Sequence, residues 1–194
     1  MISVQRFVAN KAIDKREWLA AREGRVSATE VAQAATPKGF EAILNPGPPD
    51  ENIEENPYVK FGLEQEGPIS LWVKEHFGIM PNEWLIESKN NYRYVSTPDG
   101  LSLDHKLICE IKTSGKDFGE VGIPIHYRRQ VQWQLFTTDS EKCLFAWMLR
   151  KEVDGQMVPA WWEPKTLWIE RDPKMIDQLI DTANQLIERR AENG

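Results

Sequence analysis

The segment STPDGLSLDHKLICEIKTS, residues 96–114, places the strongest constraint on how this chain can fold. Its last part, LICEIK, interleaves apolar and charged side chains, which indicates a β-strand. Successive side chains of a strand point to opposite faces, so Glu110 and Lys112 share one face while Ile111 points to the other, toward the core. The pattern therefore predicts a strand that carries a carboxylate and an amine side by side.

A predicted turn brings a second carboxylate to this strand. Asp99 precedes Gly100, which permits a tight turn, and the short strand LSL can then pair with LICEIK through a turn at Asp104 and His105. Such a hairpin returns Glu110 towards Asp99.

The rest of the chain alternates between helical and strand patterns. Apolar residues at three- and four-residue spacing indicate helices, and short runs rich in aromatic and β-branched residues indicate strands. Helices are expected at residues 14–21, 27–35, 60–77, 123–138 and 172–192, and strands in EWLIES, YRYVST, LSL, LICEIK, KCLFAWML, MVPAWWE and TLWIE. The first four strands are expected to form a meander of three or four strands.

Local signals mark where some of these elements begin and end. Ser27 with Glu30 three positions on forms a capping-box pattern, and Gly78 is expected to stop the helix before it. Five prolines and several acidic residues interrupt every periodicity between residues 36 and 57. This Pro-rich segment is expected to be a long exposed loop with at most short helical turns.

The composition places the chain in the globular class. Its 194 residues fit one domain, 1–194, and 41% hydrophobic residues accompany 28% charged ones. A net charge of −6 argues against a protein that coats nucleic acid by bulk electrostatics. A local basic groove, or a site where metal ions supply the positive charge, stays open.

Targeting and cysteine signals are weak. The N-terminus lacks the pattern of a secretory signal and no run of about 18 apolar residues occurs, so a cytoplasmic, non-membrane location is expected. Cys109 and Cys143 lie too far apart to form a zinc or iron–sulfur set alone, and buried thiols are expected.

The acidic residues of the predicted hairpin suggest a metal site. Two carboxylates brought together repel one another unless a cation or proton intervenes, and oxygen ligands suit hard ions such as Mg²⁺ or Mn²⁺. A metal held by Asp99 and Glu110 could polarise a phosphoryl oxygen and activate a water, while Lys112 orients that water or stabilises the developing anion. This constellation suits phosphodiester hydrolysis. The alternative is a common Asp-Gly turn beside a solvated Glu–Lys ion pair.

Polar residues on two helices add further candidates. Glu66, in the first turns of the long helix, could approach such a metal, or could simply favour the helix dipole. Gln130 and Gln134 are four residues apart and lie on one helix face, with Gln132 between them. Surface polarity is the preferred interpretation of Gln132 and Gln134.

Four ordered blocks carry a family resemblance: WLAAREGRVSATEV, FGLEQEGPISLWVKEHFG, STPDGLSLDHKLICEIKTS and HYRRQVQWQLF. Together they resemble the lambda exonuclease and YqaJ-type viral recombinase (phage alkaline exonuclease) branch of the PD-(D/E)XK nucleases, and the likeness continues through LWIERDPKM and the last helix. The resemblance implies an α/β (α+β) restriction-endonuclease-like core, a mixed central β-sheet flanked by α-helices. It also implies a Mg²⁺-dependent 5′-to-3′ exonuclease that digests one strand of double-stranded DNA and leaves 3′ overhangs.

The resemblance assigns roles at the metal site. Asp99, Glu110 and the backbone carbonyl of Ile111 become ligands of one or two Mg²⁺ ions, with Mn²⁺ as a possible substitute. Lys112 positions or activates the attacking water. Glu66 corresponds to the acidic residue near a second metal. Gln130 corresponds to a glutamine that helps to hold Lys112 or the nucleophile.

The resemblance also implies a site for the 5′-terminal phosphate. Arg22 and Thr29 match the arginine and hydroxyl residue of that pocket, although Thr29 stands where a serine is more familiar; an arginine fork beside a hydroxyl suits an anion. Arg25 is a second candidate for phosphate contact, with an ordinary surface arginine as the alternative. Lys38 is a candidate for DNA contact, with a solvated loop lysine preferred. Trp18 is expected to be a packing anchor rather than a base-stacking wedge.

The implied partners are DNA ends with a 5′ phosphate, two further copies of the chain in a homotrimeric ring, and a single-strand annealing protein of phage or prophage recombination. Two alternatives are an endonuclease of the same superfamily, which shares the metal site, and a catalytically silent DNA-end-binding scaffold. An iron–sulfur nuclease is disfavoured because its four cysteine ligands are absent.

Overall fold

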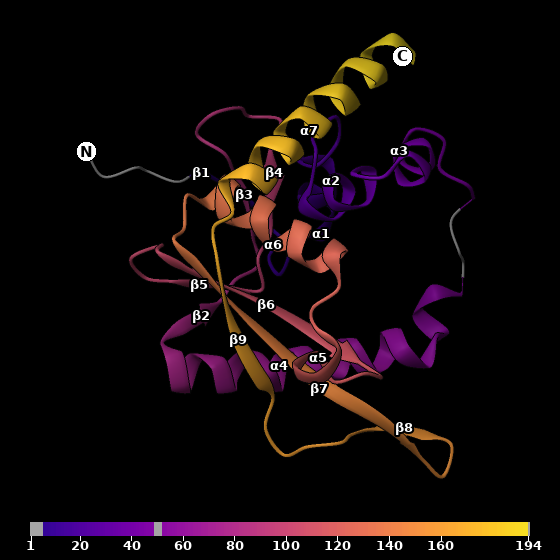
Figure 1. Ribbon diagram of the computed structural model, residues 1–194, viewed down its shortest axis with the longest axis vertical. Helices are drawn as coiled ribbons and strands as arrows, with labels where there is room; N and C mark the ends of the chain where they lie inside the picture. The colour runs from indigo at the N-terminus through magenta and orange to yellow at the C-terminus, as the bar shows by residue number, and fades with distance from the viewer. Residues whose placement is uncertain (1–5, 49–51, 194) are drawn as a thin grey trace.

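A mixed β-sheet forms the centre of the protein (Figure 1). The structure, a computed structural model, describes residues 6–48 and 52–193. The strands of this sheet are β2 (Ile79–Pro81), β5 (Gly100–Ser102), β6 (Leu107–Ser114), β7 (Lys142–Val153), β8 (Gln156–Pro159) and β9 (Lys165–Glu170). β6 and β7 pair in parallel and all other neighbours are antiparallel. The parallel pair is joined by a crossover containing α5 (Phe118–Val121) and α6 (Ile125–Thr138).

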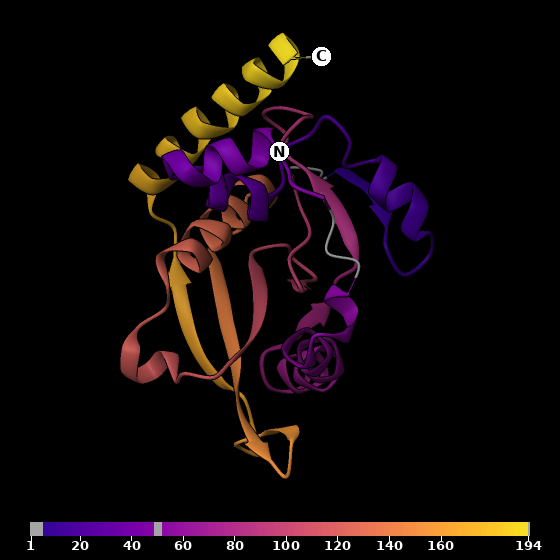
Figure 2. The same ribbon diagram turned by 90° about the vertical axis from the view of Figure 1, so that its right-hand side faces the viewer.

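Helices cover both faces of this sheet. α4 (Pro57–Phe77) packs on one face, where Phe61, Ile69 and Val73 form a buried cluster with Ile111 and other strand residues. α6 packs on the opposite face over a cluster that includes Phe145. Figure 2 shows α4 end-on at one side of the strands. The predicted mixed sheet flanked by helices is therefore confirmed.

A third layer lies over α6. It contains α2 (Ala28–Ala34) and α7 (Pro173–Asn193), while α1 (Lys15–Ala20) and α3 (Pro37–Leu44) complete the N-terminal helices. Trp133 of α6 is buried against Val31, Leu179 and Leu186. α6 is thus covered by the sheet on one side and by helices on the other.

Several predicted element boundaries are confirmed. Ser27 and Glu30 form the capping box at the start of α2, and Asp14 caps α1. α4 ends at Gly78, whose φ of 69° lies in the left-handed region that glycine tolerates. His105, also at positive φ, makes the turn between β5 and β6.

The expected meander of strands is wrong. β3 (Trp84–Glu87) pairs with β1 (Arg6–Asn10) and β4 (Val95–Ser96) in a separate antiparallel sheet, whereas β5 pairs with β2 and β6. Period-two alternation indicates that a segment is a strand, but it does not select the partner strand. Asn82 joins the two sheets, because its side-chain amide donates to the Pro98 carbonyl at 2.8 Å and its backbone N–H donates to the Asp99 carbonyl at 3.0 Å.

The Pro-rich segment is also more helical than expected. α3 occupies part of it, and a short 3₁₀ helix (Ile53–Glu55) precedes α4; residues 49–51 lie outside the described residues. Pro37 and Pro57 each occupy the first turn of a helix, where a missing N–H costs nothing, and Thr36 and Asn56 cap those helices. These two prolines start helices rather than breaking them. The predicted strand MVPAWWE likewise ends at Pro159.

Two further expectations concern burial and membranes. Cys109 and Cys143 are buried free thiols, as predicted. In the part of the chain that the structure describes, no helix combines the length and apolar character that crossing a bilayer requires.

Gly100 tests how tightly the hairpin is packed. A Cβ at this position would lie 2.9 Å from Cγ2 of Ile79 and 3.0 Å from Cβ of Cys109. We expect Gly100→Ala to lower the free energy of unfolding by about 1–3 kcal/mol, because these neighbours must shift. Urea unfolding provides the measurement. Gly115→Ala is the control, since its Cβ would meet nothing closer than Arg150 at 3.8 Å; equal stability of the two variants would contradict the prediction.

Candidate active site

The predicted hairpin brings Asp99 to strand β6. Asp99 immediately precedes β5, and Gly100 pairs with Cys109 across the hairpin. The Asp99 Oδ2 atom accepts a hydrogen bond from the backbone N–H of Ile111 at 2.6 Å. One carboxylate is therefore fixed next to the strand that carries the second.

Glu110 is almost completely buried, with 1% of its surface exposed. Its Oε1 atom accepts hydrogen bonds from the ammonium of Lys112 and from Nε2 of Gln130, the latter at 2.5 Å. Its Oε2 atom accepts from Nε2 of Gln134 at 2.6 Å. A buried carboxylate needs such partners, and here one ammonium and two amides supply them.

The surface interpretation of Gln132 and Gln134 is wrong. Both side chains are buried, because α6 is covered on two sides. Gln134 binds Glu110, whereas Gln132 donates to the Glu170 carbonyl at 2.8 Å and accepts from the Asp172 N–H at 2.7 Å. Gln130 reaches Lys112 only through the Glu110 oxygen that they share. Alternation of these glutamines with large apolar residues was the available signal for a helix buried all round.

Lys112 keeps its proton in this arrangement. Burial alone would lower the pKa of the Lys112 ammonium, but the carboxylates of Glu110 and Asp99 outweigh burial, and the pKa is raised. The ammonium also lies 5.3 Å from the ring centroid of Tyr127. Lys112 is therefore a positive charge and hydrogen-bond donor at neutral pH.

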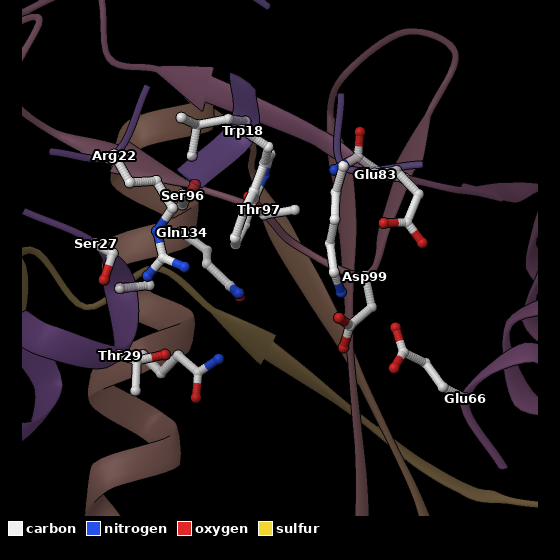
Figure 3. A pocket seen from close by; sticks show the side chains of 15 residues that line it. Trp18, Arg22, Ser27, Thr29, Glu66, Glu83, Ser96, Thr97, Asp99 and Gln134 are labelled. Atoms are coloured by element: carbon white, nitrogen blue, oxygen red, sulfur yellow. The ribbon is translucent and has the colours of Figure 1, made fainter. Parts of the chain in front are cut away.

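Asp99 has the opposite balance. Burial and the neighbouring Glu110 carboxylate, with a smaller contribution from Glu66, raise the pKa of the Asp99 carboxyl well above its usual value. Glu66 of α4 and Asp99 line one cavity, and Figure 3 shows their carboxylates facing each other. The site thus concentrates more negative charge than Lys112 alone compensates.

This donor set fits a hard divalent cation. Asp99, Glu110 and the Ile111 carbonyl offer oxygen ligands, and the raised pKa of Asp99 shows that a nearby positive charge would be favourable. Within residues 6–48 and 52–193, no three acidic, histidine or cysteine side chains lie close enough to hold a metal by themselves. Mg²⁺ commonly binds through one or two carboxylates and keeps several waters, so Glu66 would contribute through such a water.

The same cavity contains the predicted phosphate residues. The cavity is lined by Arg22, Ser27 and Thr29 together with Asp99 and Glu66. Figure 3 shows the first three residues on one side of the cavity and the two acidic residues on the other. The Ser27 hydroxyl is already hydrogen-bonded to the Glu30 side chain at 2.7 Å. Of these three residues, Arg22 and Thr29 therefore remain available to donate hydrogen bonds to a bound anion.

Trp18, Arg25 and Lys38 are placed differently. Trp18 is buried against Ala9, Leu85 and Val95, which confirms a packing role. Arg25 pairs with the buried carboxylate of Glu87 at 3.1 Å and does not line the cavity. Lys38 is exposed on α3 and does not line it either.

Several residues that line the cavity have a buried polar atom without a hydrogen-bond partner. Among the described residues, four buried side-chain polar atoms lack a hydrogen-bond partner, and three of them belong to residues that line this cavity: Trp18 Nε1, Thr97 Oγ1 and Gln134 Oε1. Buried polar atoms are normally paired, so these atoms indicate water or a ligand. The sequence interpretation missed Thr97, Gln134 and a further lining residue, Lys11.

The chain shares its fold with solved structures of exonucleases. Among solved structures, the chain is similar to the alkaline exonuclease LHK-Exo from Laribacter hongkongensis, with a TM-score of 0.70, 23% identity, and coverage of 91% of this chain and 93% of that chain. The structure of that exonuclease in complex with dAMP gives a TM-score of 0.71 at 24% identity, with the same coverage. A phage-related exonuclease from Haemophilus somnus gives 0.62 at 16% identity, covering 87% of this chain and 94% of that one. No family model and no curated protein matches the sequence. The predicted resemblance is thus confirmed in the fold.

The buried glutamines of α6 offer a matched pair of substitutions. Gln134→Leu removes a partner of the Glu110 carboxylate, and Gln132→Leu removes partners of two backbone groups near α7. We expect each to lower the free energy of unfolding by about 1–3 kcal/mol. If this site hydrolyses DNA, only Gln134→Leu should also lower the cleavage rate, by about 10–100-fold. Urea unfolding and cleavage assays test this; equal cleavage by the two variants would refute the role of Gln134.

The charge balance at Asp99 predicts a pH-dependent stability. Because the folded-state pKa is raised, stability is lost as pH rises above the unfolded value of about 3.9. In EDTA, Asp99→Asn should therefore unfold at a higher urea concentration than the unsubstituted chain at pH 7. The difference should disappear as the pH falls below about 3.9. A lower midpoint for the variant at pH 7, or a gap that does not change with pH, would show that burial of the Asp99 charge beside Glu110 does not destabilise the fold.

Proposed function

We propose that the chain is a metal-dependent nuclease that hydrolyses one strand of double-stranded DNA from its 5′ end and leaves a 3′ overhang. One observation carries the proposal: Asp99, Glu110 and Lys112 are held together beside a cavity that also contains Arg22 and Thr29. The likeness to exonucleases, one of them bound to dAMP, supports a nucleic-acid substrate.

The residues divide the chemistry between them. Held by Asp99, Glu110 and the Ile111 carbonyl, Mg²⁺ or Mn²⁺ would polarise a phosphoryl oxygen and lower the pKa of a bound water. Lys112, which stays protonated, donates hydrogen bonds that orient the water or stabilise charge on the phosphate as the bond breaks. Gln130 fixes Glu110 in position.

Two arginines near the start of α6, Arg128 and Arg129, form a basic surface segment that supports binding of a polyanion despite the net charge of −6. Burial, followed by the charges of Lys112 and Arg129, lowers the pKa of His126. Arg128 lies next to these residues at the start of α6 and is exposed. A DNA backbone that reaches Lys112 would meet this surface.

Selection of the 5′ end is assigned to Arg22 and Thr29. A guanidinium and a hydroxyl suit a terminal phosphate, which carries more charge than an internal phosphodiester. With the end held there, cleavage occurs near Asp99 on the other side of the same cavity. From the family resemblance we also propose a homotrimeric ring around the DNA and a single-strand annealing protein as partner.

The test uses linear duplex DNA with a 5′ phosphate and a label at either end, beside a covalently closed circle, in Mg²⁺ and in EDTA. We expect early release of the 5′ label in Mg²⁺ only, with the circle intact. Cutting of the circle would show an endonuclease, and absence of all cleavage would leave a DNA-end-binding scaffold.

Lys112→Met provides the matched variant. Loss of its charge should lower the cleavage rate by about 10²–10³-fold. Lys106→Met is the control, because Lys106 lies at the other end of the same strand region and pairs with Glu141 on the surface. Cleavage by Lys112→Met at the control rate would overturn the assignment.

A further inference from the structure

Two cationic side chains lie close to the indole ring of Trp18, which lines the cavity. The Arg22 guanidinium carbon lies 4.5 Å from the ring centroid, and the Lys11 Nζ atom lies 5.9 Å from it. Both distances fall within the range of cation–π attraction. Across residues 6–48 and 52–193, neither cation forms an ion pair with an acidic side chain.

The backbone around Lys11 is fixed although its side chain is exposed. The Lys11 N–H donates to the Glu83 carbonyl at 3.0 Å. Asn10, at the end of β1, accepts from the N–H groups of Ala12 at 2.9 Å and Ile13 at 3.2 Å. These hydrogen bonds hold the backbone from which the Lys11 side chain extends.

Lys11 lines two neighbouring cavities. It lines the cavity that contains Arg22 and Thr29, and it also lines the adjoining groove along α4 with Glu66 and Asp99. Lys11 and Arg22 therefore line the same cavity.

Trp18 lines the same cavity and packs against Ala9, Leu85 and Val95. The residue is only 9% exposed, and its Nε1–H has no acceptor among the described residues. Two cations at one cavity, neither with an acidic partner among the described residues, favour an anion there. A terminal phosphate monoester, with up to two negative charges and three free oxygens, is such an anion.

We propose that Lys11 binds the 5′-terminal phosphate together with Arg22, and that Trp18 is the positioning residue that holds both cations. The inference rests on the proposed function, since it gives Lys11 a part in selecting the 5′ end. The competing role for Lys11 is neutralisation of Glu66, Glu83 and Asp99, which line the same groove.

Binding measured without cleavage separates these roles. Fluorescence anisotropy in EDTA compares a short blunt duplex that carries 5′ phosphates with the same duplex carrying 5′ hydroxyls. Lys11→Met should weaken binding of the phosphorylated duplex by about two- to fivefold, as expected for an exposed charge pair, and leave the hydroxyl duplex unchanged. Lys15→Met is the control, because Lys15 is an exposed lysine of the adjacent α1 and does not line the cavity. Equal weakening on both duplexes, or none, would overturn the role of Lys11.

The positioning role of Trp18 is tested by coupling. Trp18→Leu removes the aromatic face, whereas Trp18→Phe keeps it. In the Leu background, Lys11→Met should have no further effect on the ratio of the two affinities, while in the Phe background it should keep part of its effect. Thermal unfolding establishes that the variants are folded. An undiminished effect of Lys11→Met in the Leu background would refute the positioning role, because a purely structural tryptophan would leave it intact.

The outcomes also separate this inference from the proposed function. Cleavage from 5′ ends in Mg²⁺ without any preference for the phosphorylated duplex would leave the nuclease and remove the phosphate site. Preference for that duplex in EDTA without cleavage in Mg²⁺ would leave the phosphate site and remove the nuclease.

Discussion

Burial of the Glu110 carboxylate is the constraint on which the site depends. A charge with 1% exposure is tolerated only if its oxygens are hydrogen-bonded and its charge is balanced. Lys112 on the same strand supplies the balancing charge, and Gln130 and Gln134 supply the remaining bonds. The requirement fixes how α6 lies on the sheet, since two of its side chains must reach one carboxylate. Packing of α6 and the chemistry of the site are therefore set by the same contacts.

The cavity, by contrast, is assembled from parts of the chain that are distant in sequence. Arg22 comes from the turn between α1 and α2, Glu66 from α4, Asp99 from the turn before β5 and Gln130 from α6. Asn82 holds the small sheet to the turn that carries Asp99, so the N-terminal wall and the acidic residues keep a fixed relation. A binding site divided in this way requires the whole fold, including the separate three-stranded sheet.

Sequence reasoning succeeded where the determinants are local. The shared face of Glu110 and Lys112 follows from the period of a strand, and the approach of Asp99 follows from one hairpin. It failed where distant packing decides: the glutamines of α6 were assigned to the surface although the sheet covers that helix on one side and α2 and α7 cover it on the other, and one of the two partners of β3 is a strand more than seventy residues earlier in the sequence. Pro37 and Pro57 were interpreted as loop residues because proline interrupts the interior of a helix, but proline is also favoured in the first turn of a helix. The approach of Arg22 and Lys11 to the Trp18 ring depends on distances that no sequence pattern contains.

The ammonium of Lys112 also bears on the order of events in the life of the molecule. Because this internal cation already balances Glu110, the chain can reach its folded state without waiting for an ion from solution. In the proposed nuclease, a metal ion would therefore be needed for cleavage rather than for folding.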